Sequence, residues 1–185
     1  MKILWAPWRM TYIKNPRRPA RCIFCLKASQ RRDESNLMLY RGQWGFVLMN
    51  LYPYNNGHLM VAPYAHVDSL ELLPKATALD IISLTNLSLR VLRAEMSPEG
   101  FNVGVNLGRV SGAGIEEHLH MHIVPRWNGD TNFMPVFSET RVIPELLLET
   151  YRKLRARFRT AAQQNGRSER RTATKLPRRT AKRRS

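Results

Sequence analysis

The chain has 185 residues, of which 43% are hydrophobic, and it carries a formal net charge of +16. This length and composition are typical of one globular domain with a substantial core. No apolar run reaches the roughly 20 residues that a membrane-spanning helix needs. The N-terminal segment also lacks a long apolar stretch followed by a small-residue cleavage site. We therefore expect a cytoplasmic protein without a membrane segment.

Residues 1–21 are rich in Trp, Arg and Pro and predict an irregular arm that lies against the body or against a second subunit. The aromatic residues expected to hold it there are Trp5, Trp8 and Tyr12. Cys22 and Cys25 follow in the spacing C-x-x-C, ahead of a polar loop that is expected to reach Asn36. In a chain without a secretion signal, this spacing favours metal or redox chemistry over a structural disulfide.

The middle of the chain contains short runs of strand-forming residues bounded by turn residues, and one helical segment. The predicted strands cover residues 37–40, 45–50, 58–63 and 101–107. A helical region is expected over residues 68–96, with Pro74 and Pro98 bounding the main helix. The residues of this helix that follow the i, i+3 and i+4 spacing, with one polar exception, are Leu79, Ile82, Asn86, Leu89 and Leu92. A glycine-rich loop, residues 108–114, leads to the last strand.

Three of the five histidines alternate with apolar residues within residues 117–125. A period of two predicts a β-strand, on which residues i, i+2 and i+4 face one way. His118, His120 and His122 are then a row of imidazoles about 7 Å apart along the strand. The intervening residues that point into a core are Leu119, Met121 and Ile123. Such a row indicates a site that uses imidazole as nucleophile, ligand and proton donor, rather than chance histidines on a surface strand.

The C-terminal part divides into a helix and a tail. Pro144 stands near the start of a last helix that is expected to run to about Ala162. Residues 163–185 carry nine Lys or Arg and one acid, with one Leu and no aromatic residue. This composition predicts a disordered basic tail, which either contacts nucleic acid through nonspecific electrostatics or has no specific partner. Together the elements predict an α+β domain over residues 22–162, with a mainly antiparallel five-stranded sheet, a central helix and a C-terminal helix.

The pattern His-φ-His-φ-His-φ-φ resembles the signature of the histidine triad (HIT) superfamily. Further matching features occur in the expected order: the cysteine pair, Asn50, Gly57 through Pro63, His66 and Pro125-Arg126. Within the superfamily the chain is similar to diadenosine tetraphosphate phosphorylases of the bacterial type, over roughly residues 4–162. The shared segments are residues 4–9, 50–58, 112–115 and 127–133. The resemblance implies a HIT-like fold and a homodimer, because triad proteins commonly pair two subunits.

The resemblance also implies roles for single residues. His120 matches the residue that attacks the α-phosphate and becomes nucleotidylated, and His122 matches one that donates a hydrogen bond to phosphate or to the leaving-group oxygen. Asn50 matches a ribose contact, and His58 matches a position near the nucleotide, although a structural role is equally consistent with the sequence. Neither Glu116 nor Glu117 belongs to this chemistry, so both are expected to be solvated.

The glycine-rich loop before the triad suits a phosphate, because small residues let backbone N–H groups approach its oxygens. Many triad hydrolases have Gln followed by Ser or Thr just before the triad, whereas this chain has Gly114-Ile115. We therefore expect Ser111, Gly112 or Asn132 to supply the polar contact to the transferred phosphate. This departure suits the phosphorylase subgroup better than a simple hydrolase.

Two thiolates and two imidazoles form a donor set that tetrahedral zinc prefers. The candidate ligands are Cys22, Cys25, His66 and His118. Since four protein ligands leave no open position, such a zinc would be structural and would orient the triad strand. A redox role for the cysteines, or two thiols packed in the core, are the alternatives.

The sequence thus predicts an enzyme that cleaves dinucleoside polyphosphates through a nucleotidyl-histidine, by phosphorolysis to ADP and ATP or by hydrolysis. Its substrate would be an adenine dinucleotide, and no organic cofactor is expected. The alternatives are a hydrolase of nucleoside phosphoramidates or adenylates, a nucleotide- or nucleic-acid-binding module that uses the basic tail, and a thiol redox protein.

Overall fold

The computed structural model describes residues 21–130 and 145–173, with side chains described up to residue 164. Five strands form one sheet in the order β1-β2-β3-β5-β4, and every neighbouring pair is antiparallel. The strands are β1 (Met38–Arg41), β2 (Gly45–Met49), β3 (Leu59–Pro63), β4 (Gly100–Val105) and β5 (Met121–Arg126). The predicted α+β class and five-stranded antiparallel sheet are confirmed.

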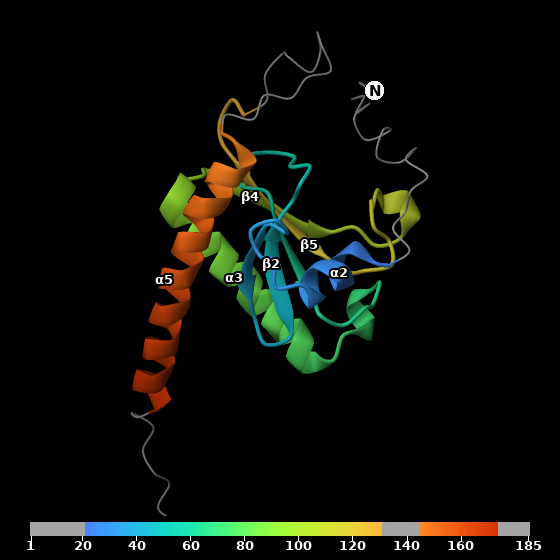
Figure 1. Ribbon diagram of the computed structural model, residues 1–185, viewed down its shortest axis with the longest axis horizontal. Helices are drawn as coiled ribbons and strands as arrows, with labels where there is room; N and C mark the ends of the chain where they lie inside the picture. Colours follow the sequence, from blue (N-terminus) through green and yellow to red (C-terminus); the bar gives the residue numbers. More distant parts are fainter. Residues whose placement is uncertain (1–20, 131–144, 174–185) are drawn as a thin grey trace, which may run out of the picture.

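Helices cover both faces of this sheet (Figure 1). The long helices α3 (Lys75–Met96) and α5 (Leu147–Ala173) pack on one face, and the short helix α2 (Ile23–Ser29) covers part of the other. Strands β2 and β3 therefore bury both faces, and their side chains alternate between two cores. Val47 and Val61 belong to the core under α3 and α5, whereas Phe46 and Ala62 belong to the core under α2.

Helix α3 ends as predicted, and Leu92 lies in the core as expected, but the rest of its buried face differs from the predicted one. Pro74 is its N-cap residue, and Ser97 ends it in the left-handed conformation at φ 46°. Leu79 and Ile82, which the apolar period placed on the buried face, are 69% and 50% exposed. The buried face instead includes Thr85 and Ser88, whose hydroxyl groups donate to the carbonyl oxygens of Ile81 and Leu84 one turn earlier. Because their hydroxyl groups are satisfied locally, these two polar residues can be buried.

Helix α2 was not predicted, since its sequence has no clear helical period over seven residues. Tertiary contacts account for it. Phe24 is 2% exposed within the second core. The Arg41 guanidinium donates to the carbonyl oxygens of Ala28 and Gln30 at the C-terminal end, at 2.8 and 2.6 Å. These bonds satisfy carbonyl groups that a helix end leaves without intrahelical partners.

Strand β5 begins at Met121, so only His122 of the three triad histidines lies on an assigned strand. The ladder between β3 and β5 stops at Val61 and Met121, and the chain before Met121 bonds elsewhere: the Leu119 N–H donates to the carbonyl oxygen of Val67 at 2.6 Å. The expected alternation nevertheless holds. Leu119 is 4% exposed and Ile123 is fully buried, whereas His118 and His120 face the other side, where their rings contact Phe24 of α2.

Helix α5 extends to Ala173, so the prediction of a disordered tail from residue 163 was wrong for its first eleven residues. Buried Tyr151, Leu154 and Phe158 anchor the first part of the helix, and Ala161 packs against the same core further along it. The N-terminal arm and residues 174–185 lie outside the described residues. Within the described ranges, no helix is both long enough and apolar enough to cross a membrane.

Candidate functional site

The four predicted metal ligands come together on the α2 side of the sheet. Their ligand atoms all lie within 4.8 Å of one another, and both cysteines are free thiols. Cys22 is the N-cap residue of α2 and Cys25 lies in its first turn, so the C-x-x-C spacing turns both sulfurs toward one point. His66 follows β3, and His118 precedes β5.

The spacing of these donors fits a tetrahedral zinc. With Zn–S near 2.3 Å and Zn–N near 2.0 Å, a tetrahedron has S···N edges of about 3.5 Å and an N···N edge of about 3.3 Å. The Nδ1 of His118 lies 3.3 and 3.5 Å from the sulfurs of Cys22 and Cys25, and 3.3 Å from the Nδ1 of His66. These three distances match the corresponding edges of the tetrahedron.

The second nitrogen of His118 sets the tautomer that ligation needs. Its Nε2 lies 3.0 Å from the carbonyl oxygen of Pro63, which only accepts, so Nε2 carries the proton and Nδ1 presents a lone pair to the cysteines. Burial lowers the pKa of His118, which keeps this ring neutral. Burial also raises the pKa of the Cys25 thiol, and the neighbouring Cys22 adds to the rise. A dication between the two sulfurs would lower the pKa of Cys25 and so offset both causes of its rise.

His120 is held as a neutral imidazole with a defined lone pair. Its Nδ1 lies 2.8 Å from the carbonyl oxygen of His118, so Nδ1 donates and Nε2 carries the lone pair. The side chain is 5% exposed, and burial lowers its pKa below the ordinary 6.5. The ring of Phe24 packs beside it at 4.8 Å between centroids. These contacts give the Nε2 atom the state that a nucleophile requires near neutral pH.

His122 receives the opposite tautomer from His58. The N–H of Tyr54 donates to Nδ1 of His58 at 3.0 Å, so the proton of His58 lies on Nε2. This Nε2 lies 3.0 Å from Nδ1 of His122. His122 accepts there, and its own proton therefore lies on Nε2. The rings of His120 and His122 are 4.8 Å apart at 69°, which places a lone pair and a proton donor side by side.

The remaining predicted ligands of the nucleotide are placed less directly. His58 is fully buried, and the Asn50 side chain is oriented by two bonds: its Oδ1 accepts from the Tyr52 N–H at 3.0 Å, and its Nδ2 lies 3.4 Å from His58. Ser111 and Gly112 lie in and just after a short 3₁₀ turn, η2 (Arg109–Ser111), where the Ser111 hydroxyl donates to the carbonyl oxygen of Gly108. Asn132 lies outside the described residues. Nucleotide contacts of all these residues stay predictions.

A groove beside His122 was missed by the sequence analysis. It has a volume of about 500 Å³ and runs along β4, with polar side chains that include Asn102, Asn106 and Arg126. Val103 and Val105 line the groove together with the two asparagines, so the alternation along this strand could not by itself have located it. Arg126 is oriented by its ion pair with Asp130 at 2.6 Å and by a bond to Asn102.

Comparisons with known proteins agree with this geometry. The HIT domain model matches residues 31–129. An AP-4-A phosphorylase of Mycobacterium tuberculosis is 41% identical over 160 residues, which are 82% of this chain and 81% of that protein. An asymmetrical bis(5'-nucleosyl)-tetraphosphatase of Schizosaccharomyces pombe is 27% identical over 106 residues, 57% of this chain and 54% of that protein. A solved zinc-bound histidine triad family protein from Mycobacterium smegmatis shares the fold, with a TM-score of 0.61 at 23% identity over 77% of this chain and 96% of that one.

Proposed function

This chain belongs to the HIT domain family, and on that premise we propose that it cleaves dinucleoside polyphosphates such as diadenosine tetraphosphate. The observation that carries the proposal is the pair of opposite tautomers at His120 and His122. Two relatives, an AP-4-A phosphorylase and a bis(5'-nucleosyl)-tetraphosphatase, support the same substrate class.

The proposed reaction has two steps. The Nε2 lone pair of His120 attacks the α-phosphorus, a P–N bond forms, and the P–O bond to the bridging oxygen breaks. The leaving nucleoside triphosphate is stabilised at that oxygen by the Nε2–H of His122. An oxygen of inorganic phosphate then attacks the nucleotidyl-histidine and releases ADP. If water attacks instead, the product is AMP.

We propose that zinc holds the triad segment in place. The side chains of Cys22, Cys25, His66 and His118 would bind it, and their mutual distances support this ligand set. With four protein ligands it offers no position for water or substrate, so its contribution is structural. Two thiols arranged for a metal also suit a reducing compartment such as the cytoplasm.

We further propose a homodimer, and the edge of the sheet supports it. β4 pairs with β5 on one side only among the described residues, and Val103 on this edge strand is 45% exposed. An exposed edge strand with an apolar residue is a template for pairing with another chain. Two copies related by a two-fold axis can pair their β4 edges in an antiparallel fashion.

The test of the proposed function is incubation with diadenosine tetraphosphate, with and without inorganic phosphate, followed by product analysis. A phosphorylase should release ADP and ATP in equal amounts, and its turnover should depend on inorganic phosphate. AMP and ATP without phosphate would identify a hydrolase. Cleavage of adenosine phosphoramidate but not of the dinucleotide would favour the phosphoramidate hydrolase. Nucleotide binding without any turnover would favour the binding module.

A further inference from the structure

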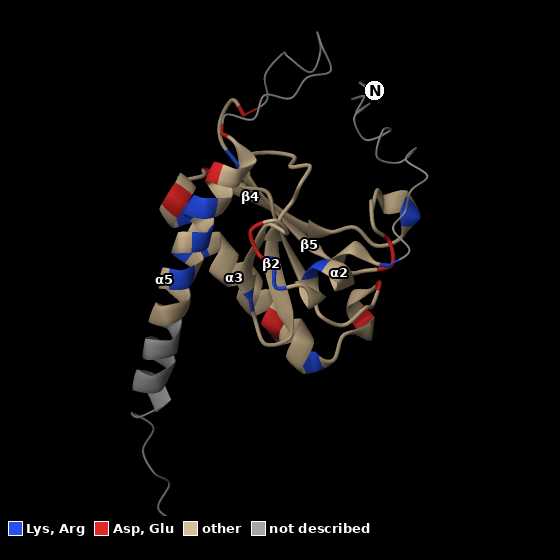
Figure 2. Ribbon diagram, viewed as in Figure 1, with Lys and Arg blue, Asp and Glu red and all other residues tan. Residues whose placement is uncertain are grey.

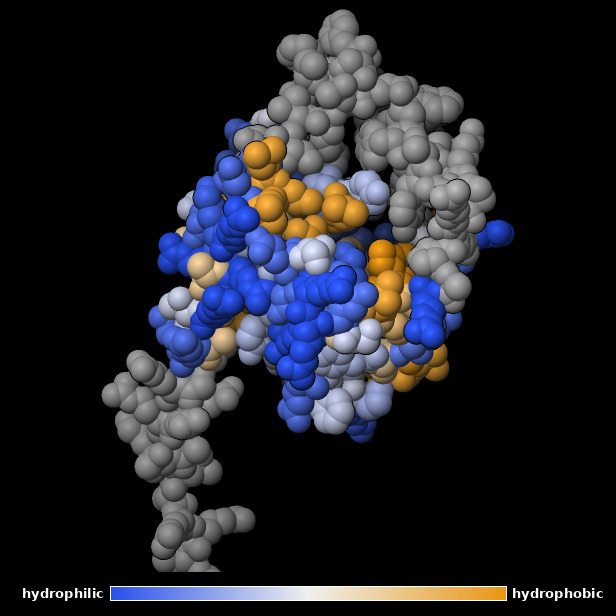
Figure 3. All heavy atoms as spheres, viewed as in Figure 1, coloured by the Kyte–Doolittle hydropathy of each residue, from blue (hydrophilic) through white to orange (hydrophobic). Residues whose placement is uncertain are grey.

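A second groove, lined by arginines, lies between α5 and the loop that follows α2. It has a volume of about 470 Å³ and shares no lining residue with the groove beside His122. Four arginines line it: Arg31 from the loop, and Arg152, Arg155 and Arg159 from α5. Figure 3 shows hydrophilic side chains gathered over this part of the surface, between α5 and α2. The proposed reaction uses none of these residues.

The three arginines of α5 lie on one face of the helix. Positions 152, 155 and 159 follow the i, i+3, i+7 spacing, so one guanidinium falls on each successive turn. From Arg152 to Arg159 the helix rises by about 10 Å. The groove therefore presents a linear row of cations rather than a compact cluster.

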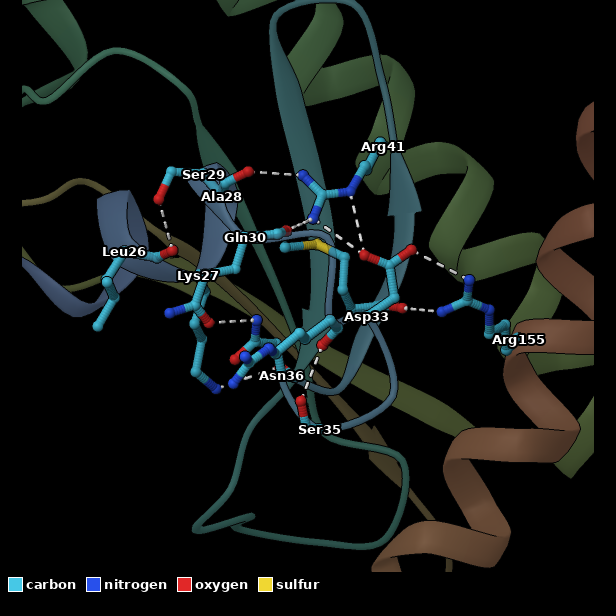
Figure 4. A network of polar contacts seen from close by, with 12 residues as sticks. Leu26, Lys27, Ala28, Ser29, Gln30, Asp33, Ser35, Asn36, Arg41 and Arg155 are labelled. Atoms are coloured by element: carbon cyan, nitrogen blue, oxygen red, sulfur yellow. Dashed lines mark hydrogen bonds and ion pairs between the residues drawn. The ribbon is translucent and has the colours of Figure 1, made fainter.

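Arg155 is oriented in advance. It donates to Asp33 at 3.0 Å, to the carbonyl oxygen of Met38 at 3.0 Å, and to the Tyr151 hydroxyl. Figure 4 shows Asp33 between Arg155 and Arg41. The two ion pairs of Asp33 therefore join the loop after α2 to α5 and to β1. A guanidinium that is already held in place loses less conformational entropy when it binds an anion.

Two other cations of the groove lack an acidic partner. The lining includes only two carboxylates, Asp33 and Glu34, which pair with Arg155 and Arg152. Arg31 and Arg159 are exposed and form no ion pair with any described acidic side chain. The groove thus retains excess positive charge, whereas Lys153 and Arg157, elsewhere on α5, are paired with Glu145 and Glu95.

The described side chains of α5 from residue 152 onward are strongly basic. Residues 152–164 contain five Lys or Arg and no acid, and Figure 2 shows these cations along α5. Tyr151, Leu154 and Phe158 are buried against the body, and Leu148 is the one large apolar side chain exposed among the described residues of α5. A helix that binds a membrane surface needs an exposed apolar face, so this composition disfavours a lipid partner.

We propose that this arginine groove binds the phosphodiester backbone of a nucleic acid, independently of base sequence. The row from Arg152 to Arg159 is about 10 Å long, so it can contact more than one phosphate of the same strand. Planar guanidinium groups bind phosphate oxygens through two parallel hydrogen bonds. The groove offers charge without a described aromatic platform for a base, since Tyr151 is buried.

The test compares two charge-matched double variants in the full chain, using a fluorescent single-stranded RNA of about 20 nucleotides over a series of salt concentrations. Arg31→Gln with Arg159→Gln removes the two unpaired groove cations. Arg90→Gln with Arg157→Gln removes two exposed cations outside the groove. For a single strand, each phosphate contact that is lost reduces the slope of log K against log salt by about 0.7 in magnitude. The groove variant should therefore lose about 1.4 in slope, and the control should keep the wild-type slope.

Several results would overturn the proposal. One is an equal loss in both double variants, and another is no loss in the groove variant. Inorganic tripolyphosphate bound as tightly as RNA would make the groove a small-anion site. Groove-dependent binding to phosphatidylserine vesicles without RNA binding would make it a lipid site. Activity on dinucleotides and the thermal midpoint should match the wild type in both variants, which separates this proposal from the proposed function.

Discussion

The Nε2 of His58 and the Nδ1 of His122 lie 3.0 Å apart, although 64 positions separate the two residues in the chain. The antiparallel register of β3 and β5 pairs Met60 with His122, which puts His58 at the diagonal position on the same face. Since the Tyr54 N–H already occupies Nδ1 of His58, this contact determines where His122 carries its proton.

Replacing His58 should therefore impair the chemical step. We expect His58→Phe to lower kcat by about 10- to 100-fold with a small change in KM, because His122 loses the donor that sets its tautomer. His58→Gln, which can still donate from an amide nitrogen, should recover part of this loss. Steady-state kinetics with diadenosine tetraphosphate measures both. An unchanged kcat in the Phe variant, or equal defects in both variants, would contradict a positioning role.

His120→Asn and His120→Ala should abolish turnover while nucleotide binding persists. Loss of a covalent nucleophile costs many powers of ten in rate, whereas binding depends on other contacts. Mass spectrometry of the wild-type protein with substrate should detect one added AMP on His120, and the variants should show none. Calorimetry with AMP provides the binding control. Near-normal activity in either variant would sink the nucleophile assignment.

Elemental analysis of protein purified without chelator should find one zinc per chain. Cys22→Ser and Cys25→Ser should each lose the metal, and removal of zinc should lower the thermal midpoint because the bound metal stabilises only the folded chain. The activity of molecules that remain folded should fall less than the stability. A zinc content near zero, with two freely titratable thiols, is the outcome that excludes this site.

Asp33→Asn should destabilise the protein by about 1–3 kcal/mol, because Asp33 accepts charge-assisted hydrogen bonds from Arg41 and Arg155. Burial opposes its ionisation, but these bonds outweigh that effect and hold the pKa of Asp33 below the ordinary 3.8. The stabilisation is therefore complete above pH 3.8 and is lost as the pH falls through the lower folded-state pKa.

Denaturant unfolding at neutral and acidic pH checks the direction of this pH dependence. The difference in free energy of unfolding between wild type and Asp33→Asn should have its full value at pH 7 and should shrink in strong acid. Glu34→Gln is the matched control: its pair with Arg152 is largely exposed, so about 0.5 kcal/mol or less is expected. A gap between wild type and Asp33→Asn that does not change with pH would contradict the role of the ionised carboxylate.

Val103→Lys should convert the proposed dimer to a monomer, because a lysine on an edge strand opposes pairing with a second chain. Val110→Lys, at a position in η2 that is 99% exposed, should leave the oligomeric state unchanged. Sedimentation at micromolar concentration distinguishes the two. A wild-type protein that is monomeric under these conditions would refute the dimer itself.

The sequence by itself determined what depends on short-range periodicity and spacing. The alternation around His120 placed the three imidazoles on one side and Leu119 and Ile123 in the core, as the structure has them. The C-x-x-C spacing likewise brought Cys22 and Cys25 together, because residues three positions apart at the start of a helix lie on the same side of it. The strand positions followed from the same local signals.

The tertiary structure alone decided the rest, because those features depend on contacts between residues far apart in the chain. The tautomers of His118 and His122 are set by Pro63 and His58, which reach them only through the register of β3 and β5. The buried face of α3 is the one whose apolar residues Ile81, Leu84 and Val91 meet the sheet and α5, and the local hydroxyl bonds of Thr85 and Ser88 let these two polar residues be buried there. Helix α2 forms because a buried Phe24 and an arginine from β1 hold it, and seven residues carry too little helix propensity to specify it alone.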